Sequence, residues 1–421
     1  MHSNIRFSRT INCLDYLIRF FLYALIFWIP YSPAVIESCV ITSLVLFIIK
    51  RFLSANKTRD FLLPPATFLN KEIGVFVLIC IAVSFFSSHR SVSFHGLFTK
   101  TLEWFIIFHL VAGSFKEKRH FLTAFIVFLV TSFAVFIDGV TQYYFLYKDI
   151  FNSQLLSDGR MTASFNHANG LAGYLTICFF AGLSWLRISK RNLWNKILPV
   201  TFMFFLLWAM IMTGSRAGWL ALFAGIFYLL FTLGKKRLGL ILLGLVVLGV
   251  LFMGKDKVFK EGTRMSLSNL SSAASWRLGL WEDSLKMIKE KPILGHGINT
   301  FMRLFQDYRR KYIGAADYSP SYAHNCYIQI AVETGILGLL SFMWIIFKFF
   351  FKLNRKIKEF PERSNSCFVI LTGISCGIFA FLAHSFFDTN LYSLQLSALV
   401  WTAMGMAVAM YNNLENLTKK C

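Results

Sequence analysis

Charge is scarce in this chain of 421 residues, and negative charge is the scarcest. Only 15 % of the residues are charged, with 21 Asp and Glu against 43 Lys and Arg. Hydrophobic residues make up 56 %, among them 47 Phe, and the mean hydropathy is +0.57. A water-soluble fold of this size could not cover so much apolar surface, so we expect a bilayer to be its solvent.

Several chemical signatures are also absent. The eight cysteines include no C-x-x-C pair, which excludes a thiolate metal site and a disulfide framework and favours small buried apolar residues. No D-x-D occurs in a predicted outer loop, and the adjacent pair Glu282–Asp283 lies on a predicted helix, where the side chains diverge. "GHGIN" (295–299) is followed by no G-K-[ST], and "GSR" (214–216) is not a G-x-S-x-G elbow. We therefore expect no bound metal and no cofactor.

What the sequence has is a series of long apolar runs. A helix needs about 17 to 25 apolar residues to cross a bilayer, and a run without period-2 alternation favours a helix over a barrel strand. The first run, with no small-x-small cleavage site, is expected to be an uncleaved anchor. We predict an all-α polytopic membrane protein with about twelve transmembrane helices, at roughly 13–32, 34–50, 73–88, 96–113, 121–143, 169–186, 197–213, 217–233, 238–254, 326–347, 367–387 and 391–411.

The net charge of +22 follows the topology. Basic residues cluster in every second connection, as in "GKKRLG" (234–239) and the stretch from Lys348 to Arg363, which is the positive-inside pattern. It places both termini in the cytoplasm. The charge then contacts membrane lipids, and nucleic acid is not an expected partner.

One connection, 255–325, is much longer than the others and lies on the outer side. Residues 273–292 have apolar residues at helical spacing, a polar opposite face and Pro292 at the end, and 293–312 form a second amphipathic segment. The predicted division is therefore transmembrane helices 1–9 in 1–254, a periplasmic loop with amphipathic helices in 255–325, and helices 10–12 with a cytoplasmic tail in 326–421.

Polar residues from separate segments gather on this outer side. A charge at a helix centre costs about 2.5 to 3.5 kcal/mol, so such residues usually face a cavity or a partner. The alternatives are a snorkelling Arg216, a solvated Arg277, and a structural pair of His384 and Asp388, which i, i+4 spacing puts on one helical face. The gathering residues are Arg160, Arg216, Arg277, His324, Asn325, His384 and Asp388, with Asp138 near the outer end of its helix.

The stretch "HNCYIQIAVETGILG" (324–338) carries His324 and Asn325, then Gly335 and Gly338. This H-N-x9-G-x-x-G pattern, after a long outer loop, resembles the O-antigen ligase family and its polymerase relatives. The resemblance extends over most of the chain, in the order of that family, through "GRMTASFNHANGLAGYL" (159–175), "TGSRAGWLAL" (213–222), "WRLGLWEDSL" (276–285) and "PILGHGINTF" (292–301). We expect the two glycines to allow close helix packing.

The resemblance implies a glycosyltransferase at the periplasmic face of a Gram-negative inner membrane. It would move O-antigen polysaccharide from undecaprenyl pyrophosphate to a sugar hydroxyl of lipid A-core. The family's histidine falls on His324 as general base, and its arginines fall on Arg216 and, less directly, Arg277. Arg160, Asn325, His384 and Asp388 are the expected substrate-binding residues.

The residue types agree with this chemistry independently. Arginine binds phosphate oxygens bidentately and stays charged as a pyrophosphate leaves. A histidine suits the attacking hydroxyl as proton acceptor. Direct displacement by one hydroxyl, without a metal, would invert the anomeric centre.

Three alternatives stay open. An O-antigen polymerase shares the carrier, and a transferase that glycosylates protein hydroxyls belongs to the same broad group. A secondary transporter would use intramembrane His384, Asp388 and Asp138 as a proton relay, but the polar cluster lies at one face and no inverted repeat is visible.

Overall fold

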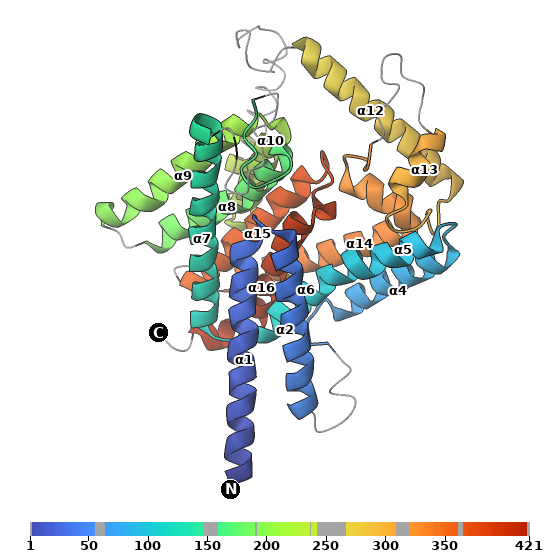
Figure 1. Cartoon of the computed structure of the whole chain (residues 1–421). Helices are drawn as coiled ribbons and strands as arrows, with labels where there is room; N and C mark the ends of the chain where they lie inside the picture. Colours follow the sequence, from blue (N-terminus) through green and yellow to red (C-terminus); the bar gives the residue numbers. More distant parts are fainter. Residues whose placement is uncertain are drawn as a thin grey trace.

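The structure is a computed structural model, and it describes residues 2–54, 64–146, 148, 159–189, 192–235, 237–241, 267–308, 320–360 and 365–418. The helices in these ranges are arranged as Figure 1 shows. They are α1 (His2–Trp28), α2 (Pro33–Ser54), α4 (Asn70–Phe86), α5 (Arg90–Gly96), η1 (Leu97–Thr101), α6 (Leu102–Ser114), α7 (Lys118–Thr141), η2 (Gln142–Leu146), α8 (Ala168–Ile188), α9 (Leu193–Thr213), α10 (Arg216–Thr232), α12 (Leu267–Glu290), α13 (Phe301–Tyr308), α14 (Cys326–Glu359), α15 (Ser366–His384), η3 (Asn390–Tyr392) and α16 (Leu394–Thr418).

The chain is an all-α polytopic membrane protein, as predicted. Within the described residues, 8 helices are long and apolar enough to cross a membrane, and α10 is a shorter apolar helix. The run 73–88 becomes α4, of 17 residues. The run 96–113 is interrupted by the π-helix η1 before α6 begins. The predicted helix 238–254 lies mostly outside the described residues.

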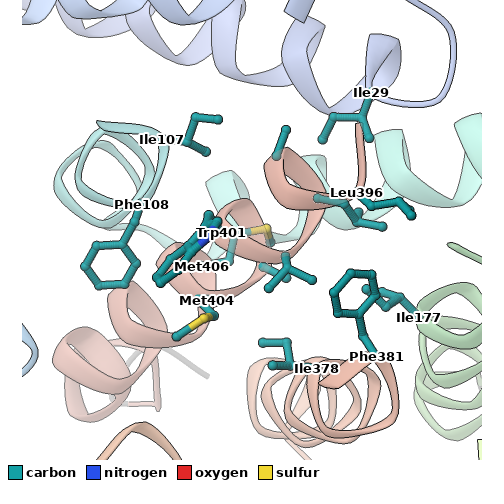
Figure 2. Packing of buried hydrophobic residues seen from close by; sticks show 14 of the residues in the cluster. Ile29, Ile107, Phe108, Ile177, Ile378, Phe381, Leu396, Trp401, Met404 and Met406 are labelled. Atoms are coloured by element: carbon teal, nitrogen blue, oxygen red, sulfur yellow. The ribbon is translucent and has the colours of Figure 1, made fainter. Parts of the chain in front are cut away.

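The core is built around α16, which packs against α6 and α15. Trp401 is fully buried there and stacks on Trp104, with ring centroids 5.9 Å apart. Figure 2 shows Trp401 beside Phe108 of α6, with Ile378 and Phe381 of α15 nearby. α15 continues the core by packing against α8 and α10, so the helices before and after the long loop form one packed body.

The predicted amphipathic segments are confirmed as α12 and α13. In Figure 1 they lie at the end of the molecule opposite the N-terminus. Leu280 and Met287 of α12 pack with Phe301 and Phe305 of α13 in a small apolar cluster of their own. Glu282 is exposed whereas Asp283 is buried, so the two carboxylates diverge as predicted.

A break in α14 holds the loop that follows α12. Gly335 has a φ of 67° within the helix, which frees carbonyl groups in the preceding turn. The N–H of His296 donates to the Val332 carbonyl (3.0 Å), and the N–H of Gly297 donates to that of Glu333 (2.9 Å). On the other side of the break, the N–H of Ile336 donates to the Pro292 carbonyl (2.8 Å). The loop is thus hydrogen-bonded into the helix, and it fixes the half of α14 that begins beside His324.

Candidate functional site

His324 occupies a tight bend immediately before α14. Its φ is 48°, a left-handed conformation in which histidine is several-fold enriched among non-glycine residues. The preceding Ala323 is held on both sides, because its N–H donates to Gln329 Oε1 (2.8 Å) and its carbonyl accepts from Trp281 Nε1 (3.1 Å). α12 and α14 together therefore hold the backbone that presents the imidazole.

Asn325 forms the N-cap of α14. Its side-chain oxygen accepts hydrogen bonds from the N–H groups of Tyr327 (2.9 Å) and Ile328 (3.1 Å), and the residue is 1 % exposed. These bonds satisfy two of the donors that a helix start leaves without partners. The H-N pair is thus a bend followed by a cap, and the cap sets where the helix starts relative to His324.

The imidazole of His324 pairs with Asp388. Nδ1 of the ring lies 3.2 Å from Asp388 Oδ1, and the two side chains are 31 % and 16 % exposed. Burial alone would raise the pKa of Asp388, but the hydrogen bond and charge of His324, the nearby His384 and the N–H of Thr389 together hold it well below its ordinary value. The carboxylate therefore orients the ring through Nδ1 and leaves Nε2 as the nitrogen that can accept a proton.

The prediction that His384 and Asp388 share one helical face is wrong. α15 ends at His384, and Asp388 lies in the turn beyond it. Asp388 Oδ1 accepts a hydrogen bond from the N–H of Thr389 (2.8 Å), which is the local side-chain-to-backbone bonding by which Asp favours turns over helices. Leaving the helix brings Asp388 to His324, whose neighbour Cys326 donates through Sγ to the Asp388 carbonyl (3.3 Å).

His384 itself is fully buried. Its Nδ1 contacts Asn390 Nδ2, and both lie where α8 approaches at Gly173. Nε2 has no hydrogen-bond partner among the described residues. The structure therefore gives His384 a place behind the turn that carries Asp388, and gives its ring no exposed surface.

Arg160 is bound to the turn between α9 and α10, from which Arg216 starts. Arg216 is the first residue of α10, before its apolar run. Arg160 Nε donates to the Thr213 carbonyl at the end of α9 (2.7 Å), and its Nη2 donates to Asn169 Oδ1 (3.1 Å). The N–H of Met161 adds a bond to the Met212 carbonyl (3.1 Å). The segment before α8 is therefore fastened to the turn from which Arg216 starts.

Arg277 comes to the same region from α12. The adjacent Trp276 has its ring 5.4 Å from that of His324, in an edge-on arrangement. Burial lowers the pKa of Arg216, and the positive charge of Arg277 lowers it further, so the two guanidinium groups lie within electrostatic range. The charge of Arg277 also reaches His384.

Two like charges within electrostatic range of each other favour a bound anion. Repulsion between guanidinium groups is relieved when an anionic oxygen lies between them, and arginine forks bind phosphate oxygens in pairs. The site thus combines a carboxylate-oriented imidazole with closely placed cations from α10 and α12. Its components can accept a proton on one side and stabilise a departing anion on the other.

Sequence reasoning missed the residues that hold this arrangement. Trp281 and Gln329 both bond the backbone of Ala323, and Trp276 packs on the imidazole. The available signal was an indole on the apolar face of the amphipathic segment 273–292, since a buried Trp N–H usually needs an acceptor.

Comparison with known proteins bears on this region of the chain. The family described as O-antigen ligase matches residues 201–343, which include Arg216, Arg277 and His324. This segment is therefore similar to the O-antigen ligase family. The expected resemblance is confirmed, and it falls on the part of the chain that carries the site.

Curated relatives agree over a shorter stretch. Provisionally named polysaccharide ligases of Rickettsia typhi and Rickettsia conorii are 36 % identical over 104 residues and 32 % identical over 110 residues. Each match covers 23 % of this chain and 25 % of the relative. An uncharacterized Haemophilus influenzae protein is 27 % identical over 130 residues, which is 29 % of this chain and 31 % of that protein. The chain thus matches about a quarter of the length of the named relatives.

Proposed function

We propose that this protein is an O-antigen ligase, a glycosyltransferase that takes O-antigen polysaccharide from undecaprenyl pyrophosphate and joins it to a sugar hydroxyl of lipid A-core. The reaction takes place at the periplasmic face of a Gram-negative inner membrane, in lipopolysaccharide biosynthesis. The observation that carries the proposal is the pairing of His324 with Asp388, with Trp276 against the imidazole and the next residue, Arg277, within electrostatic range of Arg216.

Each of these side chains has a role in one step of the proposed reaction. The acceptor hydroxyl attacks the anomeric carbon while Nε2 of His324 takes its proton, and Asp388 stabilises the imidazolium that forms. The bond between the anomeric carbon and the phosphate oxygen breaks, and Arg216 and Arg277 stabilise the charge on the leaving pyrophosphate. A single displacement inverts the anomeric centre, and the chain's own cations carry the leaving-group charge without a metal.

The remaining predicted residues have supporting parts in this proposal. Arg160, fastened to the α9–α10 turn, adds positive charge beside Arg216. Asn325 acts through the start of α14, and His384 acts through the turn that it supports behind Asp388. Asn325 and His384 would then influence substrate binding indirectly, by positioning His324 and Asp388.

Complementation tests the proposal. Wild type and His324→Ala are expressed in a host without its ligase and in a host without its polymerase, each matched in sugars, and lipopolysaccharide is displayed on a gel. We expect long chains on lipid A-core in the ligase-deficient host alone. His324→Ala should abolish them, because a general base contributes about 10²- to 10⁴-fold.

The matched control is His167→Ala, an exposed histidine at the start of α8, which should retain the wild-type pattern. Rescue of the polymerase-deficient host alone would assign chain extension. Rescue of neither host by well-expressed protein would contradict both transferases and favour transport.

A further inference from the structure

A cavity lined by both apolar and polar residues lies near the site. Its volume is about 350 Å³, at the lower end of the range for small-ligand pockets. α4, η1, α6, α14 and the segment 391–397 contribute to its walls, together with Ile298 and Asn299 of the outer loop. The four residues given catalytic roles above are not among those lining it, so this space is not the pyrophosphate site.

Glu103 is the residue of the cavity wall whose buried carboxyl group lacks a hydrogen-bond donor among the described residues. It lies on the wall of the cavity and is 9 % exposed. No hydrogen bond or ion pair joins it to any residue that the structure describes, and its charged neighbour is Glu37, another carboxylate. A carboxyl group removed from water without a donor is costly. A ligand that brings hydrogen-bond donors into the cavity would remove that cost.

The other polar groups form a fixed frame around this carboxyl group. Glu333 accepts hydrogen bonds from Gln329 Nε2 (2.8 Å) and from the hydroxyl of Tyr392 (3.1 Å). Lys100 Nζ donates to Asn299 Oδ1 (2.9 Å) and reaches the hydroxyl of Tyr322 (3.4 Å). These bonds already hold the frame in place, so a ligand need not order it on binding.

The lining chemistry indicates which ligand fits. Carboxyl oxygens accept hydrogen bonds from hydroxyl groups, and Phe76, Trp104 and Tyr392 are among the residues that give the cavity its apolar lining. Glu37, Glu103 and Glu333 outnumber Lys100, and this balance disfavours phosphorylated and uronic-acid sugars.

Two short chain segments connect the lining of the cavity to the catalytic residues. Tyr322 lies two positions before His324 in the chain, and Leu391 three positions after Asp388. The rings of Tyr322 and Tyr392 contact each other across this wall, with centroids 5.5 Å apart. A ligand in the cavity would thus press on the two backbone segments that carry the base and its carboxylate.

We propose that this cavity is a saccharide subsite, in which Glu103 accepts hydroxyl hydrogen bonds from a sugar unit without acidic groups. The proposal rests on the ligase function and adds a second contact region for one of its two substrates. The sugar unit belongs to the donor polysaccharide or to the acceptor core, and both present the same hydroxyl chemistry.

Binding of simple glycosides to the full chain in nanodiscs tests the subsite directly. The probes are methyl glucoside and methyl glucuronide, detected by saturation-transfer NMR. We expect the neutral probe to bind and the acidic probe to bind much less. Glu103→Leu removes the acceptor and should weaken binding roughly tenfold, without lowering the melting temperature, because the carboxyl group has no described partner to lose.

A blocking variant keeps the test independent of Glu103. Thr99 is exposed and lines the cavity, so Thr99→Trp should obstruct the space at little cost to the fold. Phe98→Trp, at the adjacent exposed position outside the lining, is the matched control and should bind like wild type. Absence of binding to the wild type, or equal binding to wild type, Glu103→Leu and Thr99→Trp, would overturn the subsite.

Transfer kinetics then identify the substrate. A rise in KM for the lipid-linked donor in Thr99→Trp would assign the sugar to the donor, and a rise in KM for the core acceptor would assign it to the acceptor. If neither KM rises, the subsite is refuted as a substrate contact. A wild type that binds methyl glucoside through Glu103 but transfers no polysaccharide would refute the ligase function and leave the cavity as a saccharide site.

Discussion

At the scale of single residues, the pair of His324 and Asp388 makes the sharpest prediction. Asp388→Asn keeps an oxygen for the N–H of Thr389 but removes the charge that stabilises the imidazolium. We expect the transfer rate to fall by about 10²- to 10⁴-fold. Purified variant and wild type are compared across the same buffers.

The Asp388 carboxylate also makes the stability of the fold depend on pH. Its pKa is depressed in the folded protein, so the stability that it contributes is present above the unfolded value of about 3.9 and is lost only as pH falls through the lower folded value. Thermal unfolding of wild type and Asp388→Asn across the acidic pH range measures this loss. An identical acid dependence of the melting temperature in the two proteins would contradict the depressed pKa of Asp388.

How far the sequence predicts the site differs from residue to residue. His324, Arg216 and Arg277 could be named because motif order and residue chemistry agree. Polarity alone does not predict that Asn325 caps a helix or that His384 is buried. The first depends on where α14 starts, and the second depends on how Asn390 and α8 pack around the ring. Glu103 gave no signal, because a carboxyl group inside an apolar run shows its lack of partners only after folding.

At the scale of elements, the break in α14 is the feature that joins the outer loop to the membrane helices. Gly335→Ala would place a Cβ 2.1 Å from the Ile293 carbonyl oxygen at a φ of 67°. We expect destabilisation of at least about 1 to 3 kcal/mol, which is the cost of a strained backbone position. Thermal unfolding in detergent measures it, and transfer activity should fall with it.

The matched control is Gly74→Ala in α4, where nothing lies within 4 Å of the added methyl group. Alanine is preferred over glycine inside a helix by roughly 0.5 to 1 kcal/mol, so this variant should unfold at or above the wild-type temperature. Equal behaviour of the two variants would show that the loop does not depend on the break.

Periodicity predicted the elements better than it predicted their interruptions. Apolar runs and the amphipathic segment 273–292 gave helices at nearly the right places. The glycine spacing suggested close packing, but the insertion of 292–297 at Gly335 needs a partner distant in sequence. The end of α15 at His384 was missed for the same reason, because Asp388 is held by His324.

At the scale of the whole molecule, composition alone predicted the fold class, since the bilayer leaves few ways to satisfy a backbone. Composition did not predict the lengths of the individual helices. The π-helix η1 interrupts one apolar run, and α4 and α10 are short for a membrane span. α10 begins at Arg216, a polar residue of the candidate site, so a full-length apolar helix is not required there.

The topology remains a prediction, and the site depends on it. Ser321 is exposed three residues before His324, and Ser54 is exposed at the end of α2, before a basic connection. In spheroplasts, a membrane-impermeant maleimide should label Ser321→Cys, and should label Ser54→Cys only after permeabilisation. Of the native cysteines that the structure describes, all but Cys13 are buried, and Cys13 lies on the predicted cytoplasmic half of α1. The reverse labelling would put His324 and Asp388 on the cytoplasmic side, where a periplasmic transfer to lipid A-core cannot occur.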